Sequence, residues 1–178
     1  MSACFFLHWL TAQHPDALML SIDPNITHLH IENPQQYVTR LVERFGLARR
    51  HLLLTGYTLE KNIGTYDATL PDLMLDAVER MPREAASENV LPNLAQLGLK
   101  FDFVVIDGNH DAAYLTRELD VIQPMLATPA ILILDDVSAH WERVTELYTR
   151  FLSSSVFVQV ARDGRLGILL KTETKAQS

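Results

Sequence analysis

Four side chains that could do acid–base or metal chemistry directly follow two apolar runs in the second half of the chain. Asp107 and His110 come after the first run, and Asp135 and Asp136 come after the second. Three carboxylates that converge repel one another unless a cation lies between them. Oxygen ligands of this kind suit Mg²⁺ or a similar divalent ion. We therefore expect a metal site at Asp107, Asp135 and Asp136, against the alternative that they are solvated strand ends or helix caps.

Two further residues could act on a substrate or a cofactor. His110 can accept a proton near neutral pH, although a histidine in a surface loop is the simpler interpretation. Asp23 ends an apolar run and precedes Pro24. A carboxylate at that position can accept hydrogen bonds from both hydroxyls of a ribose, as in dinucleotide-binding units, or it can simply form a turn before proline.

The elements that must position these residues alternate between helix and strand. Helical spacing is typical of the segments around residues 3–13, 37–45, 74–81, 90–97, 115–126 and 144–151. Short apolar runs at residues 17–22, 51–54, 101–106 and 130–134 are typical of buried strands. Two more runs, 156–160 and 166–170, flank an Asp-Gly pair and predict a hairpin. The pattern predicts a Rossmann-like, doubly wound α/β fold with a mainly parallel sheet and a C-terminal antiparallel hairpin.

In such sheets ligands bind beyond the carboxyl ends of the strands, which is where Asp23, Asp107 and Asp135 fall. We expect one domain over residues 1–172 and a polar tail over residues 173–178. Asp111 is the expected N-cap of the helix after residue 110.

Composition excludes several classes of protein. The net charge is −7, which disfavours a nucleic-acid partner because that affinity depends on cationic neutralisation. Cys4 is the only cysteine, so there is no internal disulfide and no cysteine-based zinc site. No apolar run approaches the roughly 18 residues of a membrane span, and the apolar start lacks the flanks of a signal peptide. We expect a cytoplasmic protein with no membrane partner.

The sequence Gly108-Asn109-His110-Asp111 resembles a motif of metallophosphoesterases, in which the Asn binds metal. That family also carries an upstream Asp-x-His and a Gly-Asp-x-x-Asp, and this chain has neither. The metallophosphoesterase interpretation is therefore the lesser alternative.

A second resemblance covers nearly the whole chain. The sequence from Phe101 to His110, FDFVVIDGNH, is similar to the fourth-strand motif of class I methyltransferases, in particular the metal-dependent O-methyltransferases of antibiotic sugars and of catechols. The segment ILILDDV at 131–137 resembles the fifth strand of that fold with its paired acids, and the final hairpin resembles its reversed last strands.

The resemblance implies S-adenosylmethionine as cofactor, Mg²⁺ or a similar ion as metal, and a small hydroxylated molecule as methyl acceptor. It implies that Asp23 holds the cofactor ribose, that Gly56, Tyr57 and Thr58 contact the adenine, and that Asp107 also lies at the cofactor. His110 stands where the catechol-type enzymes place a lysine base, and it is the expected catalytic residue. Asn109 occupies the position of an aspartate base in the antibiotic-sugar enzymes and cannot accept a proton at neutral pH.

The chain departs from the family at its start. The family's first strand ends in a glycine-rich loop, whereas no glycine precedes Gly46 here. We expect the first strand to be missing and the domain to be N-terminally incomplete, with a gap in the sheet. Loss of a central strand would expose apolar surface and favour a homo-oligomer. The sequence leaves open whether the chain binds cofactor without that loop, and the competing interpretation is a non-catalytic methyltransferase-like remnant that serves as a binding or interaction module.

Overall fold

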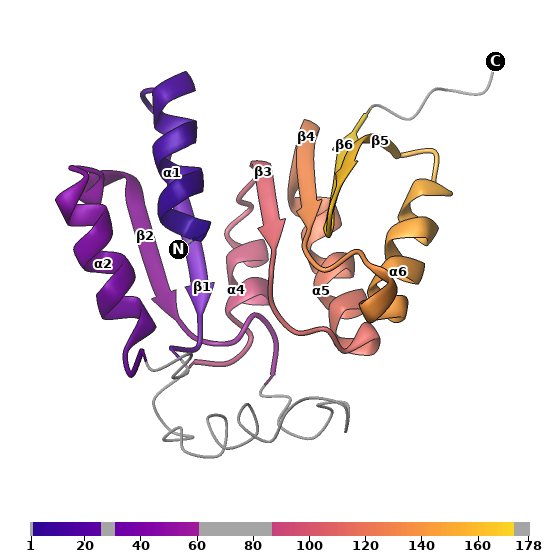
Figure 1. The fold of residues 1–178 in the computed structure, drawn as a ribbon, viewed down its shortest axis with the longest axis horizontal. Helices are drawn as coiled ribbons and strands as arrows, with labels where there is room; N and C mark the ends of the chain where they lie inside the picture. The colour runs from indigo at the N-terminus through magenta and orange to yellow at the C-terminus, as the bar shows by residue number, and fades with distance from the viewer. Residues whose placement is uncertain (1, 26–30, 61–86, 173–178) are drawn as a thin grey trace. The chain divides into compact units, whose positions relative to one another are not determined.

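The structure is a computed structural model that describes residues 2–25, 31–60 and 87–172. The chain divides into two compact units, Met1–Val90 and Leu91–Ser178. Figure 1 labels the helices and strands. The helix expected around residues 74–81 and the polar tail lie outside the described residues. Whether residues 1–172 behave as one domain stays a prediction.

The first unit contains a parallel pair of strands with helices before and between them. In chain order its described elements are α1 (Ser2–Gln13), β1 (Met19–Asp23), α2 (Pro34–Arg44), η1 (Ala48–Arg50) and β2 (His51–Thr55). The two strands pair in register from Met19 opposite His51 to Asp23 opposite Thr55. This parallel pairing places the carboxyl ends of both strands side by side.

The core of the first unit joins both helices to β1. Cys4 and Leu7 of α1 pack with Val42 of α2, and Met19 of β1 lies against them. Burial of these apolar side chains is the main force that holds the unit together. Asn33 caps α2 because its side chain accepts a hydrogen bond from the backbone N–H of Gln36 at 2.9 Å.

The second unit contains a four-stranded sheet of order β3-β4-β6-β5. Its elements are α4 (Val90–Gln96), β3 (Phe101–Ile106), α5 (Ala112–Met125), β4 (Leu126–Leu134), η2 (Ala139–Trp141), α6 (Glu142–Leu152), β5 (Phe157–Asp163) and β6 (Leu166–Lys171). β3 and β4 are parallel, whereas β6 runs antiparallel to both β4 and β5. The expected combination of parallel strands and a C-terminal antiparallel hairpin is confirmed.

The hairpin between β5 and β6 turns through two residues, because Asp163 pairs with Leu166. Gly164 is the first of the two and has a φ of +56°, which suits a tight hairpin turn with glycine at that position. Farther along, Gly167 pairs with Leu134 and lies against the ring of Tyr148 from α6. The hairpin is thereby fixed to the end of β4.

One detail of the second unit differs from what the periodicity predicts, and one local prediction holds. β4 begins at Leu126 and not near residue 130, because Leu126 already pairs with Phe101 before a shift in register. Leu126, which the periodicity assigns to the end of the helix, is therefore the first residue of the strand. The N-cap prediction is confirmed, since Asp111 Oδ1 accepts a hydrogen bond from the N–H of Tyr114 at 2.8 Å.

The described strands pair as two sheets, β1-β2 in one unit and β3-β4-β6-β5 in the other. Within the part of the chain that the structure describes, no helix is both long enough and apolar enough to cross a lipid bilayer.

Candidate functional site

The acidic residues of the second unit meet because β3 and β4 are parallel neighbours. Ile106 pairs with Leu134 as the last residue of each strand, and the N–H of Asp135 donates to the carbonyl of Ile106 at 3.0 Å. Asp107 and Asp135 therefore emerge at the same sheet edge. The parallel pairing thus explains why the two acids lie close together.

Asp135 and Asp136 are both buried, and both contact one arginine. Arg165 Nη2 lies 2.6 Å from Asp135 Oδ2, and Arg165 Nη1 lies 3.4 Å from Asp136 Oδ1. Successive residues of a strand point to opposite faces, but Asp136 has a φ of +58°, which breaks that alternation. The left-handed backbone at this residue lets two consecutive carboxylates face the same guanidinium.

Sequence reasoning missed Arg165, which it treated only as part of a hairpin. A signal was present, since two adjacent aspartates that become buried require a cation nearby. The guanidinium comes from a residue 30 positions farther along the chain, so its proximity depends on the antiparallel return of β6 beside β4.

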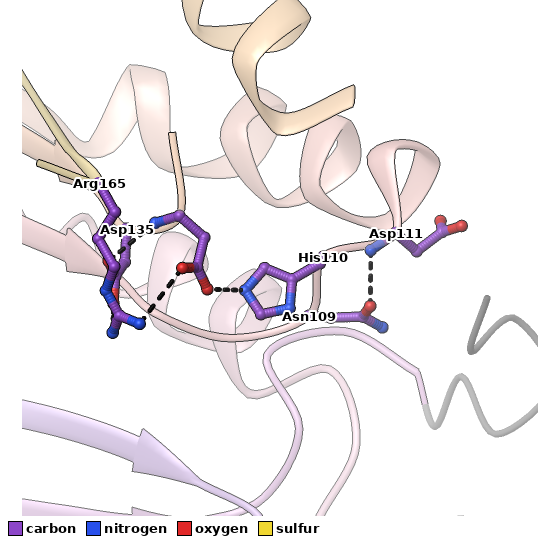
Figure 2. Close-up of polar contacts among 6 residues, drawn as sticks. Asn109, His110, Asp111, Asp135 and Arg165 are labelled. Atoms are coloured by element: carbon purple, nitrogen blue, oxygen red, sulfur yellow. Dashed lines mark hydrogen bonds and ion pairs between the residues drawn. The ribbon is translucent and has the colours of Figure 1, made fainter. Parts of the chain in front are cut away.

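His110 points toward the same cluster (Figure 2). Its Nε2 lies 2.6 Å from Asp136 Oδ2. The imidazole stacks on the ring of Trp141 with centroids 4.2 Å apart and an angle of 18° between planes. The ring keeps some contact with solvent, since its side chain is 26% exposed, so a bound molecule could reach it.

Asn109 turns away from the carboxylates. Its Oδ1 accepts a hydrogen bond from the N–H of Asp111 at 2.8 Å, as Figure 2 shows. The side chain thus shapes the loop before α5. A metallophosphoesterase would need this oxygen on a metal, so the arrangement does not support that alternative.

The pKa of Asp107 lies above its ordinary value. Partial burial of the carboxyl is the main cause, and the neighbouring Asp135 carboxylate raises the pKa further by repulsion and by a hydrogen bond between the two groups. Arg165 acts in the opposite direction. Asp107 remains exposed as a residue, so solvent moderates these effects.

The expected metal ligands do not fit a divalent ion as they stand. Within the part of the chain that the structure describes, no three His, Cys, Asp or Glu side chains are arranged to hold one metal ion. Asp135 and Asp136 direct oxygens to Arg165, and the other oxygen of Asp136 faces His110. On Asp135 and Asp136, these contacts engage oxygens that Mg²⁺ would otherwise bind.

A shallow pocket with room for about one water molecule lies at this sheet edge. It is lined by Ile106, Asp107, Gly108, Asn109, His110, Leu115, Leu134, Asp135 and Val144. The sequence-predicted catalytic residue and two of the predicted metal ligands therefore share one depression.

The remaining predicted site residues belong to the first unit. Asp23 Oδ1 accepts a hydrogen bond from the N–H of Asn25 at 2.6 Å, which is the turn-forming role. The carbonyl of Asp23 accepts from the N–H of Gly56 at 3.0 Å, so the ends of β1 and β2 are joined. Contact of Asp23 with a ribose stays a prediction.

Gly56 is required by a close approach of the chain. A Cβ there would lie 2.6 Å from the carbonyl oxygen of Ser87 and 2.7 Å from Val90 Cγ2. Tyr57 contacts the same two residues. Its N–H donates to the carbonyl of Ser87 at 2.8 Å, and its carbonyl accepts from the N–H of Val90 at 3.2 Å. The structure thus gives Gly56 and Tyr57 a packing role, and contact of Gly56 to Thr58 with adenine stays a prediction.

Parallel strands with acidic carboxyl ends and a reversed terminal hairpin are the features of a methyltransferase fold. A family model described as a methyltransferase domain matches residues 1–137, and the chain belongs to that family. The family implies S-adenosylmethionine as the methyl donor. No curated protein sequence matches the chain.

Two solved structures have the same fold at low sequence identity. One is a provisionally assigned caffeoyl-CoA O-methyltransferase from Staphylococcus aureus, with a TM-score of 0.54 and 11% identity over 96% of this chain and 83% of that one. The other is the MycE methyltransferase of mycinamycin biosynthesis, solved with Mg, SAH and mycinamycin VI, with a TM-score of 0.54 and 10% identity. The match covers 98% of this chain and 50% of MycE.

Proposed function

We propose that the protein transfers a methyl group from S-adenosylmethionine to a hydroxyl oxygen of a small molecule, with His110 as the proton acceptor. The observation that carries this proposal is the 2.6 Å contact between His110 Nε2 and Asp136 Oδ2, at the sheet edge that also bears Asp107. The two similar structures, both named as methyltransferases and one as an O-methyltransferase, support the choice of reaction.

The contact with Asp136 determines which nitrogen of His110 can take a proton. A neutral imidazole that donates from Nε2 to a carboxylate leaves the lone pair of Nδ1 as the acceptor. Stacking on Trp141 limits rotation of the ring. An imidazole held in this way can accept a hydroxyl proton as the oxygen takes up the methyl group, and the Asp136 carboxylate stabilises the imidazolium that forms.

The cofactor, when bound, supplies a methyl group on a positively charged sulfur. Asp23 would hold its ribose, with Gly56, Tyr57 and Thr58 at the adenine and Asp107 also at the cofactor. Asp107, Asp135 and Asp136 bring three carboxyl groups to this rim, and Arg165 pairs with the last two, so the rim is acidic. Negative charge favours the approach of a cationic donor.

No step of this proposal passes through a metal ion. The Mg²⁺ expected from the resemblance would need oxygens that already bind Arg165 and His110.

The test is methyl transfer from S-adenosylmethionine labelled in its methyl group to a panel of catechols, simple phenols and glycosides. The proposal predicts label recovered as a methyl ether of at least one acceptor. Label recovered only on nitrogen or carbon, or no transfer to any member of the panel, would count against it.

A further inference from the structure

The most unusual feature of the site is the guanidinium that bridges two buried carboxylates. Asp135 and Asp136 have side chains only 7% and 13% exposed, whereas the side chain of Arg165 is 62% exposed. Buried carboxylates need a positive partner, and an arginine fork can serve two of them through separate nitrogens. Arg165 supplies that partner from the solvent side.

The backbone holds Arg165 in this position. Its carbonyl accepts a hydrogen bond from the N–H of Val137 at 2.7 Å, directly after the two aspartates. Arg162, on the other strand of the hairpin, donates from Nη2 to the carbonyl of Val137 at 3.2 Å. Val137 is fully buried, so the hairpin turn and the end of β4 are joined by contacts away from solvent.

The arrangement also divides the Asp136 carboxylate between two partners. Oδ1 faces Arg165 Nη1 at 3.4 Å, and Oδ2 faces His110 Nε2 at 2.6 Å. Each oxygen therefore already has a positive or hydrogen-bonding neighbour. A divalent ion that bound Asp135 and Asp136 would lie against the guanidinium, and like charges at such a distance repel strongly in a partly buried site.

We propose that the Arg165 guanidinium takes the place of a divalent cation at these carboxylates, so that the wild-type protein does not bind Mg²⁺ or Mn²⁺ there. Arg165 is in this view a positioning residue that acts on His110 through Asp136. The inference does not depend on the methyl-transfer reaction, since it concerns only which cation the carboxylates bind.

The test is Mn²⁺ binding to the full chain, measured by electron paramagnetic resonance of free Mn²⁺, for the wild type and for Arg165→Gln. Arg143→Gln is the matched control, because it removes the same charge from an exposed position of α6. We expect Arg165→Gln to bind Mn²⁺ at least about tenfold more tightly than the wild type and Arg143→Gln. Adding Asp135→Asn to Arg165→Gln should return the affinity to the wild-type level.

Stoichiometric Mn²⁺ binding by the wild type would overturn the proposal, and this result needs no folded variant. Equal affinities of the wild type and a folded Arg165→Gln protein would also overturn it, whether both bind or neither does. Binding gained by Arg165→Gln that persists after Asp135→Asn would place the ion elsewhere and would overturn it as well.

Discussion

Oδ2 of Asp136 lies 2.6 Å from Nε2 of His110, although the two residues follow different strands of the sheet. The contact links the loop after β3 to the loop after β4. His110, the expected catalytic residue, thereby has a carboxylate partner. A ring with such a partner is held in one orientation and one tautomer. The proposed chemistry depends on this pair.

Replacing His110 with alanine should lower methyl-transfer turnover by roughly 10²-fold, because a positioned general base contributes about that much. The affinity for S-adenosylmethionine should change little, since the cofactor contacts are assigned to other residues. Steady-state kinetics with a competent acceptor, together with a cofactor titration, would measure both quantities.

His140→Ala is the control for that variant. His140 is exposed and makes an edge contact with Trp141, the same ring on which His110 stacks. Turnover close to the wild type is expected for it. If His110→Ala also kept wild-type turnover and lost only stability, His110 would have a packing role and no part in proton transfer.

Gly167→Ala should destabilise the second unit by about 1–3 kcal/mol, the usual cost of overpacking. A Cβ at Gly167 would lie 2.5 Å from Cε2 of Tyr148, a side chain that is almost fully buried and has little room to move. Urea unfolding would measure the loss. Gly108→Ala is the matched control, since a Cβ there meets nothing within 4 Å, and equal stability of the two variants would refute the packing argument.

Asp107→Asn should raise stability at neutral pH and lose that advantage in acid. The pKa of Asp107 is higher in the folded protein than the unfolded value of about 3.9. The favourable contribution of Asp107 to the free energy of unfolding is fully present below the unfolded pKa and is lost as the pH rises through the folded pKa. The ionised carboxylate therefore lowers stability near pH 7.

Urea midpoints measured across a pH series would test this prediction, with Asp102→Asn on the exposed side of the same strand as control. A variant whose advantage grew as the pH fell would contradict the assigned direction of the pKa shift.

Much of the fold could be predicted from local pattern. The apolar run that became β3 and the hairpin around Gly164 are signalled within a few residues, and Asp111 is a cap that sequence alone identifies. The neighbouring acids Asp107 and Asp135 follow from the rule that parallel strands end together.

The partners of the acids could not be predicted in the same way. Asp136 faces Arg165 and His110 because its backbone adopts a left-handed conformation, which hydrophobic periodicity does not encode. Arg165 reaches the site through strand pairing between distant segments. The side-chain oxygen of Asn109 accepts a hydrogen bond from a nearby backbone N–H. The geometry of the loop decides this partner, and the residue type alone does not predict it.

The most direct test of the proposed function is the affinity for S-adenosylmethionine, measured by titration calorimetry on the wild type, Asp23→Asn and Asp16→Asn. Asp16 is an exposed acid of the same unit whose ion pair with Arg50 is long, at 3.5 Å, so its variant controls for loss of charge. Loss of a hydrogen bond to a charged group costs about 1.5–3 kcal/mol, which corresponds to roughly 10- to 100-fold in affinity. We predict saturable binding by the wild type and by Asp16→Asn, and binding weaker by that factor for Asp23→Asn. A wild-type protein that gave no saturable heat with S-adenosylmethionine would contradict the proposed function.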